Sequence, residues 1–116
     1  MRPGKHNLFC PQGTTFAKTL TYEINDVPVN LTGYGARLQV REFFYSPDYT
    51  LALDSSSGSA YIYTGGSAGT ININVPPGIT EDIVPGDYVY DIEIYTSENV
   101  YRLLEGKFIV GPEVTR

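Results

Sequence analysis

Residues 35–43 read GARLQVREF, and this stretch decides the fold class. Its apolar residues Ala36, Leu38 and Val40 occupy every second position, and charged or amide side chains fill the positions between them. Because successive side chains of a β-strand point to opposite faces, the pattern predicts a strand with one buried face and one face in water.

The same alternation recurs at residues 70–75 and 88–95, a strand is expected at 14–24, and short strands are expected at 51–53 and 61–63. Turn signals rich in Gly, Pro, Asn and Asp separate these strands, and residues 80–82 are expected to start a single helical turn. Residues 96–99 should connect the strand at 88–95 to a last strand at 100–110. These elements predict an all-β protein, an immunoglobulin-like antiparallel β-sandwich of about seven strands.

Strict alternation also assigns faces within the strands. Phe16, Leu20 and Tyr22 should point inward from the first strand. In the last strand, the even-numbered residues from Val100 to Val110 should share one face and the odd-numbered residues the other. Apolar residues then occur on both faces, which is typical of an internal strand or one that contacts a partner.

A chain of 116 residues fits one domain with one core. Residues 1–12 are interpreted as an N-terminal arm, in which residues 7–9 could add one short strand. Residues 13–112 form the sandwich domain, and residues 113–116 form a C-terminal tail.

The net charge of −5 argues against nucleic acid as a partner, because an acidic surface repels phosphate backbones. The apolar runs are only a few residues long, which argues against membrane insertion.

Several motifs could carry chemistry, but none is convincing. The loop around Ser67 matches G-x-S-x-G, yet a strand rather than a helix follows it, and the only histidine is His6. Cys10 is the only cysteine and is expected to be an inert thiol, so a zinc site lacks ligands. We therefore expect no catalytic residue, no cofactor and no metal, and a protein that is not an enzyme.

Two further motifs have ordinary explanations. Glu81, Asp82, Asp87 and Asp91 could form an acid–base pair or hold calcium, but solvated surface charge is the favoured interpretation. Residues 30–32 form a glycosylation sequon, which has meaning only in a chain that enters a secretory pathway.

Aromatic side chains are the feature that stands out. Phe43, Phe44, Tyr45 and Tyr49 crowd one strand end and the loop after it. Two consecutive aromatic residues cannot both face inward on one strand, so core and protein interface remain about equally supported for this segment. These four residues are the candidate protein-interface residues.

Several segments together resemble the small structural proteins encoded among the tail and baseplate genes of tailed bacteriophages. The segments that carry the resemblance are 12–16, 31–41, 88–94, 102–106 and 110–116. Their sandwich is similar to the N-terminal domain of some phage upper-baseplate proteins. The resemblance spans about residues 12–116 and leaves the aromatic segment uncovered.

The resemblance implies a virion component without enzymatic activity, repeated around a symmetric particle. Its expected partners are other phage structural proteins and copies of itself, and the tail or baseplate is favoured over the capsid. Two alternatives stay open from the residues: a receptor- or carbohydrate-binding module of the tail, since Tyr-rich loops also suit sugar stacking, and a capsid-decorating protein.

Overall fold

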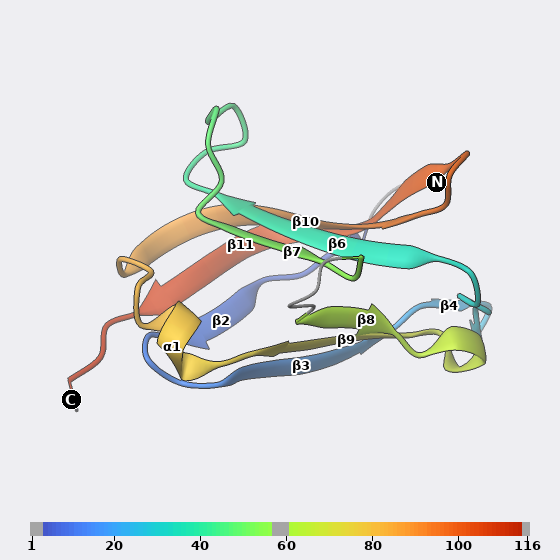
Figure 1. The fold of residues 1–116 in the computed structure, drawn as a ribbon, viewed down its shortest axis with the longest axis horizontal. Helices are drawn as coiled ribbons and strands as arrows, with labels where there is room; N and C mark the ends of the chain where they lie inside the picture. Colours follow the sequence, from blue (N-terminus) through green and yellow to red (C-terminus); the bar gives the residue numbers. More distant parts are fainter. Residues whose placement is uncertain (1–3, 57–60, 115–116) are drawn as a thin grey trace.

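Two β-sheets packed face to face form the body of the protein (Figure 1). The computed structural model describes residues 4–56 and 61–114. The larger sheet has the order β1-β11-β10-β6-β7, and β2 also pairs with β11. Its strands are β1 (Gly4–Lys5), β2 (Leu8–Pro11), β6 (Gly35–Arg41), β7 (Leu51–Asp54), β10 (Gly86–Tyr95) and β11 (Val100–Gly111).

The smaller sheet has the order β3-β9-β8. Its strands are β3 (Phe16–Thr21), β9 (Thr70–Val75) and β8 (Ile62–Thr64). A two-stranded hairpin, β4 (Glu23–Ile24) and β5 (Val27–Pro28), extends from the end of β3, and two short helical turns complete the fold: η1 (Gly66–Ala68) and α1 (Pro77–Thr80).

The strand partition is that of an immunoglobulin-like sandwich. Strands β3, β9 and β8 form one layer, and β11, β10 and β6 form the centre of the other, with β7 as an additional edge strand. The predicted fold class is therefore confirmed. One detail differs: β1 and β2 run parallel to β11, so the larger sheet is not purely antiparallel.

The alternation predicted for the central strands is confirmed in the core. Ala36, Leu38 and Val40 are buried and pair across the sheet with β10 through Ile94, Ile92 and Tyr90 respectively. Residues of β9 and the start of β3 close the core from the other layer, and Phe16 packs edge-on against Phe108 of β11. Leu20 and Tyr22 are partly buried against this core, in line with their expected inward orientation.

Residues 4–11 are not a free arm, contrary to the interpretation of residues 1–12, of which residues 1–3 lie outside the described part. Leu8 and Cys10 are 2% and 1% exposed and belong to the core, and residues 8–11 pair with residues 108–111 of β11. The Tyr90 hydroxyl donates a hydrogen bond to the carbonyl of His6, which ties β1 and β2 to the interior. The short strand expected within this segment is present as β2.

The C-terminal tail lies only partly within the described residues. Glu113 and Val114 follow β11 without regular structure, and residues 115–116 lie outside the described part.

The face assignment of the last strand is wrong in its first half. The register of β11 against β10 shifts at a bulge, where Ile92 is opposite Leu104 but Glu93 is opposite Arg102. Leu103 is the additional residue, and it is buried on the core side. An extra residue reverses the alternation, so Arg102 is on the outer face, whereas Phe108 and Val110 face the core.

The predicted turns are mostly present. Asn25 and Asp26 join β4 to β5 with φ angles of 52° and 65°, the left-handed conformation that a two-residue hairpin turn requires. The single helical turn begins at Pro77 rather than at Thr80, because the fixed φ of proline suits the first helical position. Thr80 ends this turn, and its buried hydroxyl donates to the Thr14 carbonyl at 2.7 Å.

Candidate interaction surface

The loop that connects β6 to β7, residues 42–50, exposes all four of its aromatic side chains. Phe43 is 50%, Phe44 85%, Tyr45 70% and Tyr49 59% exposed. The choice between core and surface that the sequence left open for these residues is therefore settled: none of them is in the core. We call this segment the aromatic loop; it projects beyond the end of β6 (Figure 1).

A β-turn at the tip explains why the rings point outward. The Ser46 amide donates to the Phe43 carbonyl at 3.0 Å, which places Phe44 and Tyr45 at the two central positions of the turn. The Ser46 hydroxyl accepts a hydrogen bond from the Phe43 amide, also at 3.0 Å. Backbone and serine hydrogen bonds thus hold the turn, and the aromatic rings need not be buried in the core.

Arg41 fastens this turn to the sheet. Its Nη1 donates to the Ser46 carbonyl at 2.9 Å, and its Nη2 donates to Gln39 Oε1 at the same distance. The Thr50 amide donates to the Val40 carbonyl at 2.7 Å and closes the base of the loop. A loop held at both its base and its tip loses less conformational entropy when it binds a partner.

The rings pack on one another. Phe43 and Tyr45 stack with centroids 5.4 Å apart and planes 5° from parallel. Phe44 meets Tyr45 edge-on at 5.1 Å. The tip of the loop is therefore a small apolar cluster in water, already arranged before any partner arrives.

The outer face of the larger sheet lies beside this loop and carries most of the basic residues. We call it the charged face. Cross-strand pairing aligns its side chains in rows, for example Arg102, Glu93, Arg37 and Asp54 across four strands. The members are Lys5, Arg37, Gln39, Arg41, Asp54, Asp91, Glu93, Arg102, Glu105 and Lys107.

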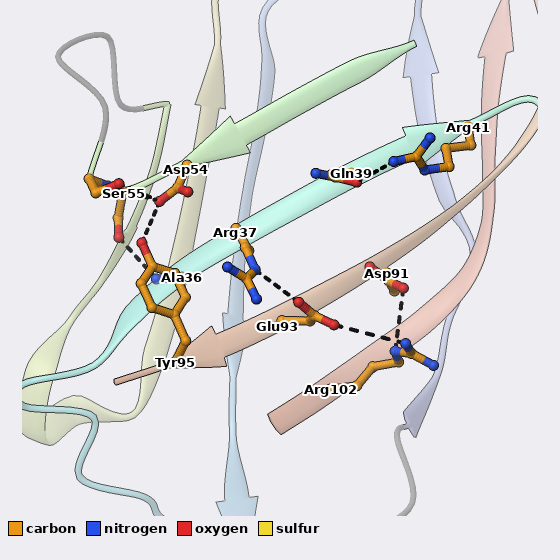
Figure 2. Close-up of polar contacts among 11 residues, drawn as sticks. Ala36, Arg37, Gln39, Arg41, Asp54, Ser55, Asp91, Glu93, Tyr95 and Arg102 are labelled. Atoms are coloured by element: carbon orange, nitrogen blue, oxygen red, sulfur yellow. Dashed lines mark hydrogen bonds and ion pairs between the residues drawn. The ribbon is translucent and has the colours of Figure 1, made fainter. Parts of the chain in front are cut away.

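Figure 2 shows that ion pairs join the centre of this face. Arg37 Nε lies 2.9 Å from Glu93 Oε1, and Arg102 Nε lies 3.3 Å from Asp91 Oδ2. A longer contact of 3.9 Å joins Arg102 to the second oxygen of Glu93. Because these side chains are partly exposed, the pairs fix side-chain positions more than they stabilise the fold.

The edge of the charged face is ordered by Tyr95. Its hydroxyl donates to Asp54 Oδ1, and the Arg37 guanidinium carbon lies 4.7 Å from the centre of its ring (Figure 2). Burial tends to raise the pKa of Asp54, but hydrogen bonds from Tyr95 and Ser56 and the charge of Arg37 outweigh it and lower this pKa. Asp54 is therefore a carboxylate at neutral pH.

Asp91, in the middle of the face, shows the opposite effect. Burial raises its pKa, and the neighbouring carboxylates of Glu93 and Glu105 raise it further. Arg102 and Arg41 lower it without cancelling the increase. Asp91 is therefore harder to ionise than a fully exposed aspartate.

A shallow hollow of about 470 Å³ links the charged face to the aromatic loop. Phe44 lines it from the loop, and Val89 supplies an apolar floor. Its charged lining residues are Lys5, Arg41, Asp91, Arg102, Glu105 and Lys107. The loop and the charged face thus form one continuous surface, the candidate site of interaction.

The motifs considered for catalysis are not brought together. Ser67 lies exposed in η1, which leads into strand β9, so the strand-to-helix geometry of a hydrolase is absent at this serine. Cys10 is buried, and burial raises the pKa of its thiol to about 11. Neither residue is positioned as an activated nucleophile.

The acidic residues 81–91 divide between two places. Asp91 belongs to the charged face, whereas Asp82 and Asp87 line a separate hollow together with Glu42. Within residues 4–56 and 61–114 no group of three or more His, Cys, Asp or Glu is arranged to hold a metal ion. No helix in the described part of the chain is both long and apolar enough to cross a bilayer.

Sequence reasoning did not single out the residues that order the charged face. Arg37, Glu93 and Arg102 each lie on the solvent-facing side of a strand, where a single charged residue does not by itself indicate a functional site. Alternation in residues 35–41 and 86–95 does predict that such side chains share a face, but their pairing needs the strand order β11-β10-β6.

No protein-family model matches this chain, and no curated protein matches it. Among solved structures, that of a protein named Tim-1 aligns over 99% of this chain and 99% of its own length, with a TM-score of 0.40 and 13% sequence identity. A similarity of this degree gives no information on function, so we argue the function from the residues of this chain.

Proposed function

We propose that the protein is a non-enzymatic structural component of a bacteriophage virion, an adaptor of the tail or baseplate that binds other virion proteins and copies of itself. The observation that carries the binding role is the aromatic loop, in which four aromatic side chains are exposed on an ordered turn. The resemblance of the sequence to phage tail and baseplate proteins supplies the class of partner.

The energetics of the loop favour protein binding. Exposed Phe and Tyr side chains carry a large apolar area, and their burial in an interface typically contributes about 2 kcal/mol or more per anchor residue. Arg41 and Ser46 hold the turn in place before binding, so less ordering is required on association. An isolated copy gains little stability from such a cluster, since its rings contact one another and not the core.

The first test asks whether the protein belongs to a particle. A tagged copy is expressed in cells that are infected with the phage whose genome encodes the chain, and virions are purified by density gradient. We expect peptides of the protein in the virion by mass spectrometry and co-sedimentation of the purified protein with tail proteins. Its absence from virions together with failure to co-sediment would overturn the virion role.

The second test asks whether the aromatic loop is the contact. The double substitution Phe44→Ala and Tyr45→Ala should abolish incorporation into virions, whereas Tyr63→Ala should not. Tyr63 is a matched control because it is 55% exposed but lies on β8 in the smaller sheet. Equal incorporation of both variants would exclude the loop as the contact.

Sugar binding is a second candidate, and the stacked rings of Phe43 and Tyr45 are the observation that favours it, since pyranose rings pack on such faces. A glycan array distinguishes the two functions. Clear binding that is lost in Tyr45→Ala and Tyr49→Ala would support a receptor-binding module. Imaging of particles with and without tails would identify the remaining alternative, a capsid-decorating protein.

A further inference from the structure

Charge is distributed unevenly over the molecule. Of the six lysine and arginine residues within residues 4–56 and 61–114, five lie on the charged face: Lys5, Arg37, Arg41, Arg102 and Lys107. The sixth, Lys18, is on β3 in the other sheet. On the remaining described surface, the carboxylates therefore greatly outnumber the lysine and arginine side chains.

The positive charge that is not neutralised by an ion pair lies at the hollow beside the aromatic loop. Arg37 and Arg102 are engaged in ion pairs with Glu93 and Asp91, but Lys5, Arg41 and Lys107 make no ion pair with any described residue. All three line the hollow of the charged face. With Arg102, Asp91 and Glu105 included, the lining carries four basic and two acidic side chains, a net charge of +2.

A second hollow, of about 550 Å³, has the opposite character. Its charged lining residues are Glu42, Asp82 and Asp87, with no basic side chain among them. Burial, and then the charge of Glu42, raise the pKa of Tyr88 on its wall. The two segments that form this end, residues 42–50 and 76–87, contain five carboxylates and no lysine or arginine. We call it the acidic end; α1 and the aromatic loop mark its position in Figure 1.

We propose that the acidic end of one copy docks on the charged face of a second copy. The proposal rests on the proposed function, of which self-association is a part, and it names the two surfaces that meet. Glu42, Asp82 and Asp87 would be opposite Lys5, Arg41 and Lys107, so each unpaired cation gains a carboxylate partner.

The aromatic loop contributes lining residues to both hollows. Phe44 lines the basic hollow and Glu42 lines the acidic one, so the loop belongs to the rim of each surface. In a junction between copies, its rings would supply apolar contact, and the charged pairs would fix the register.

A symmetric pairing of two charged faces is less favourable. It would bring together two hollows that each carry a net charge of +2, whereas the acidic end offers three carboxylates and no basic side chain. End-to-face contact uses two different surfaces of each copy, and such contacts generate rings when the rotation closes and filaments when it does not.

Sedimentation velocity of the full chain tests the proposal. We expect the wild type to associate in low salt (about 0.02 M) and to bind itself at least about tenfold more weakly in about 0.5 M salt, where charges are screened. A wild type that stays monomeric in low salt up to millimolar concentration would overturn the proposal.

Charge reversal identifies the surfaces. The variants Lys5→Glu with Lys107→Glu, and Asp82→Lys with Asp87→Lys, should each lose self-association but associate again when mixed. The variant Lys18→Glu is the matched control and should associate like the wild type. Circular dichroism checks that each variant is folded, and the mixing experiment is informative because each variant keeps one intact surface.

The outcomes separate this inference from the proposed function. If the reversed variants associate like the wild type, or if mixing restores nothing, the end-to-face contact is wrong. Loss of virion incorporation in the Phe44→Ala and Tyr45→Ala variant would then still support the adaptor role. Absence of the wild type from virions would overturn that role, but it would not change the sedimentation result.

Discussion

At the scale of single residues, Gly106 shows how the N-terminal segment enters the sandwich. A Cβ atom at this position would lie 2.1 Å from the carbonyl oxygen of His6, closer than any real contact. Gly106 is opposite Tyr90, whose hydroxyl donates to the same carbonyl. The missing side chain thus makes room for the backbone that joins β1 to β2.

We expect Gly106→Ala to destabilise the protein by about 2 kcal/mol, because the added methyl forces the N-terminal backbone away from β11. Gly111→Ala is the matched control: it lies in the same strand, and its Cβ would meet nothing within 4 Å. Urea denaturation at neutral pH measures the free energy of unfolding of both variants. Equal stability of the two variants would show that the close approach at Gly106 does not matter.

The pKa of the Cys10 thiol predicts how the free energy of unfolding changes at alkaline pH. Burial raises the pKa of this thiol from 9.0 to about 11. Because its pKa is higher in the folded protein, this thiol loses its proton at a lower pH in the unfolded chain. The contribution of the neutral thiol to the free energy of unfolding is therefore complete below pH 9 and is lost as the pH rises through about 11. Burial also raises the pKa of Tyr90, to about 12, which extends the loss to higher pH.

We expect Cys10→Ala to be less stable than the wild type at pH 7, because a packed side chain is removed. The difference should narrow between pH 9 and about 11, since only the wild type has this thiol to ionise. Thermal unfolding of both proteins across this range gives the comparison. A difference that stays constant would mean that the thiol is not protected from ionisation.

At the scale of elements, the strands differ in how far the sequence predicts them. Strands β6, β9 and β10 follow from alternation alone, because each buries one face over most of its length and keeps that alternation unbroken. Strand β11 does not, since the residue inserted at Leu103 reverses the alternation and only the partner strand reveals it.

The N-terminal strand and the candidate site are harder still to predict from the sequence. A short strand is expected at residues 7–9, but the pairing of β2 with residues 108–111 joins segments far apart in the chain, so no local pattern indicates this pairing. The four aromatic residues of the loop were found from the sequence, but their exposure depends on a turn held by Arg41 and Ser46. The charged face depends on pairing among five strands.

The bulge in β11 makes a prediction at this scale. Leu103 is 9% exposed and packs in the core, whereas Leu104 is only partly buried at its border. We expect Leu103→Ala to cost about 3 kcal/mol and Leu104→Ala about 1 kcal/mol. Strict alternation places Leu104 with Phe108 on one face and predicts the reverse order, so chemical denaturation of the two variants decides between the registers.

At the scale of the whole molecule, the N-terminal segment changes where the domain begins. The core includes Leu8 and Cys10, and the pairs between β2 and β11 shield what would otherwise be an open edge of the larger sheet. We therefore expect the described sandwich to unfold together with residues 8–11, which contribute to its stability.

Two neighbouring substitutions on β2 test this boundary. Leu8 is 2% exposed and Phe9 67% exposed, although both belong to the same four-residue strand. We expect Leu8→Ala to cost between about 2 and 5 kcal/mol, as for a large residue in a core, and Phe9→Ala less than about 1 kcal/mol. If the segment were an arm outside the domain, both variants would unfold at the same urea concentration as the wild type. A large loss confined to Leu8→Ala would instead place this strand inside the folding unit.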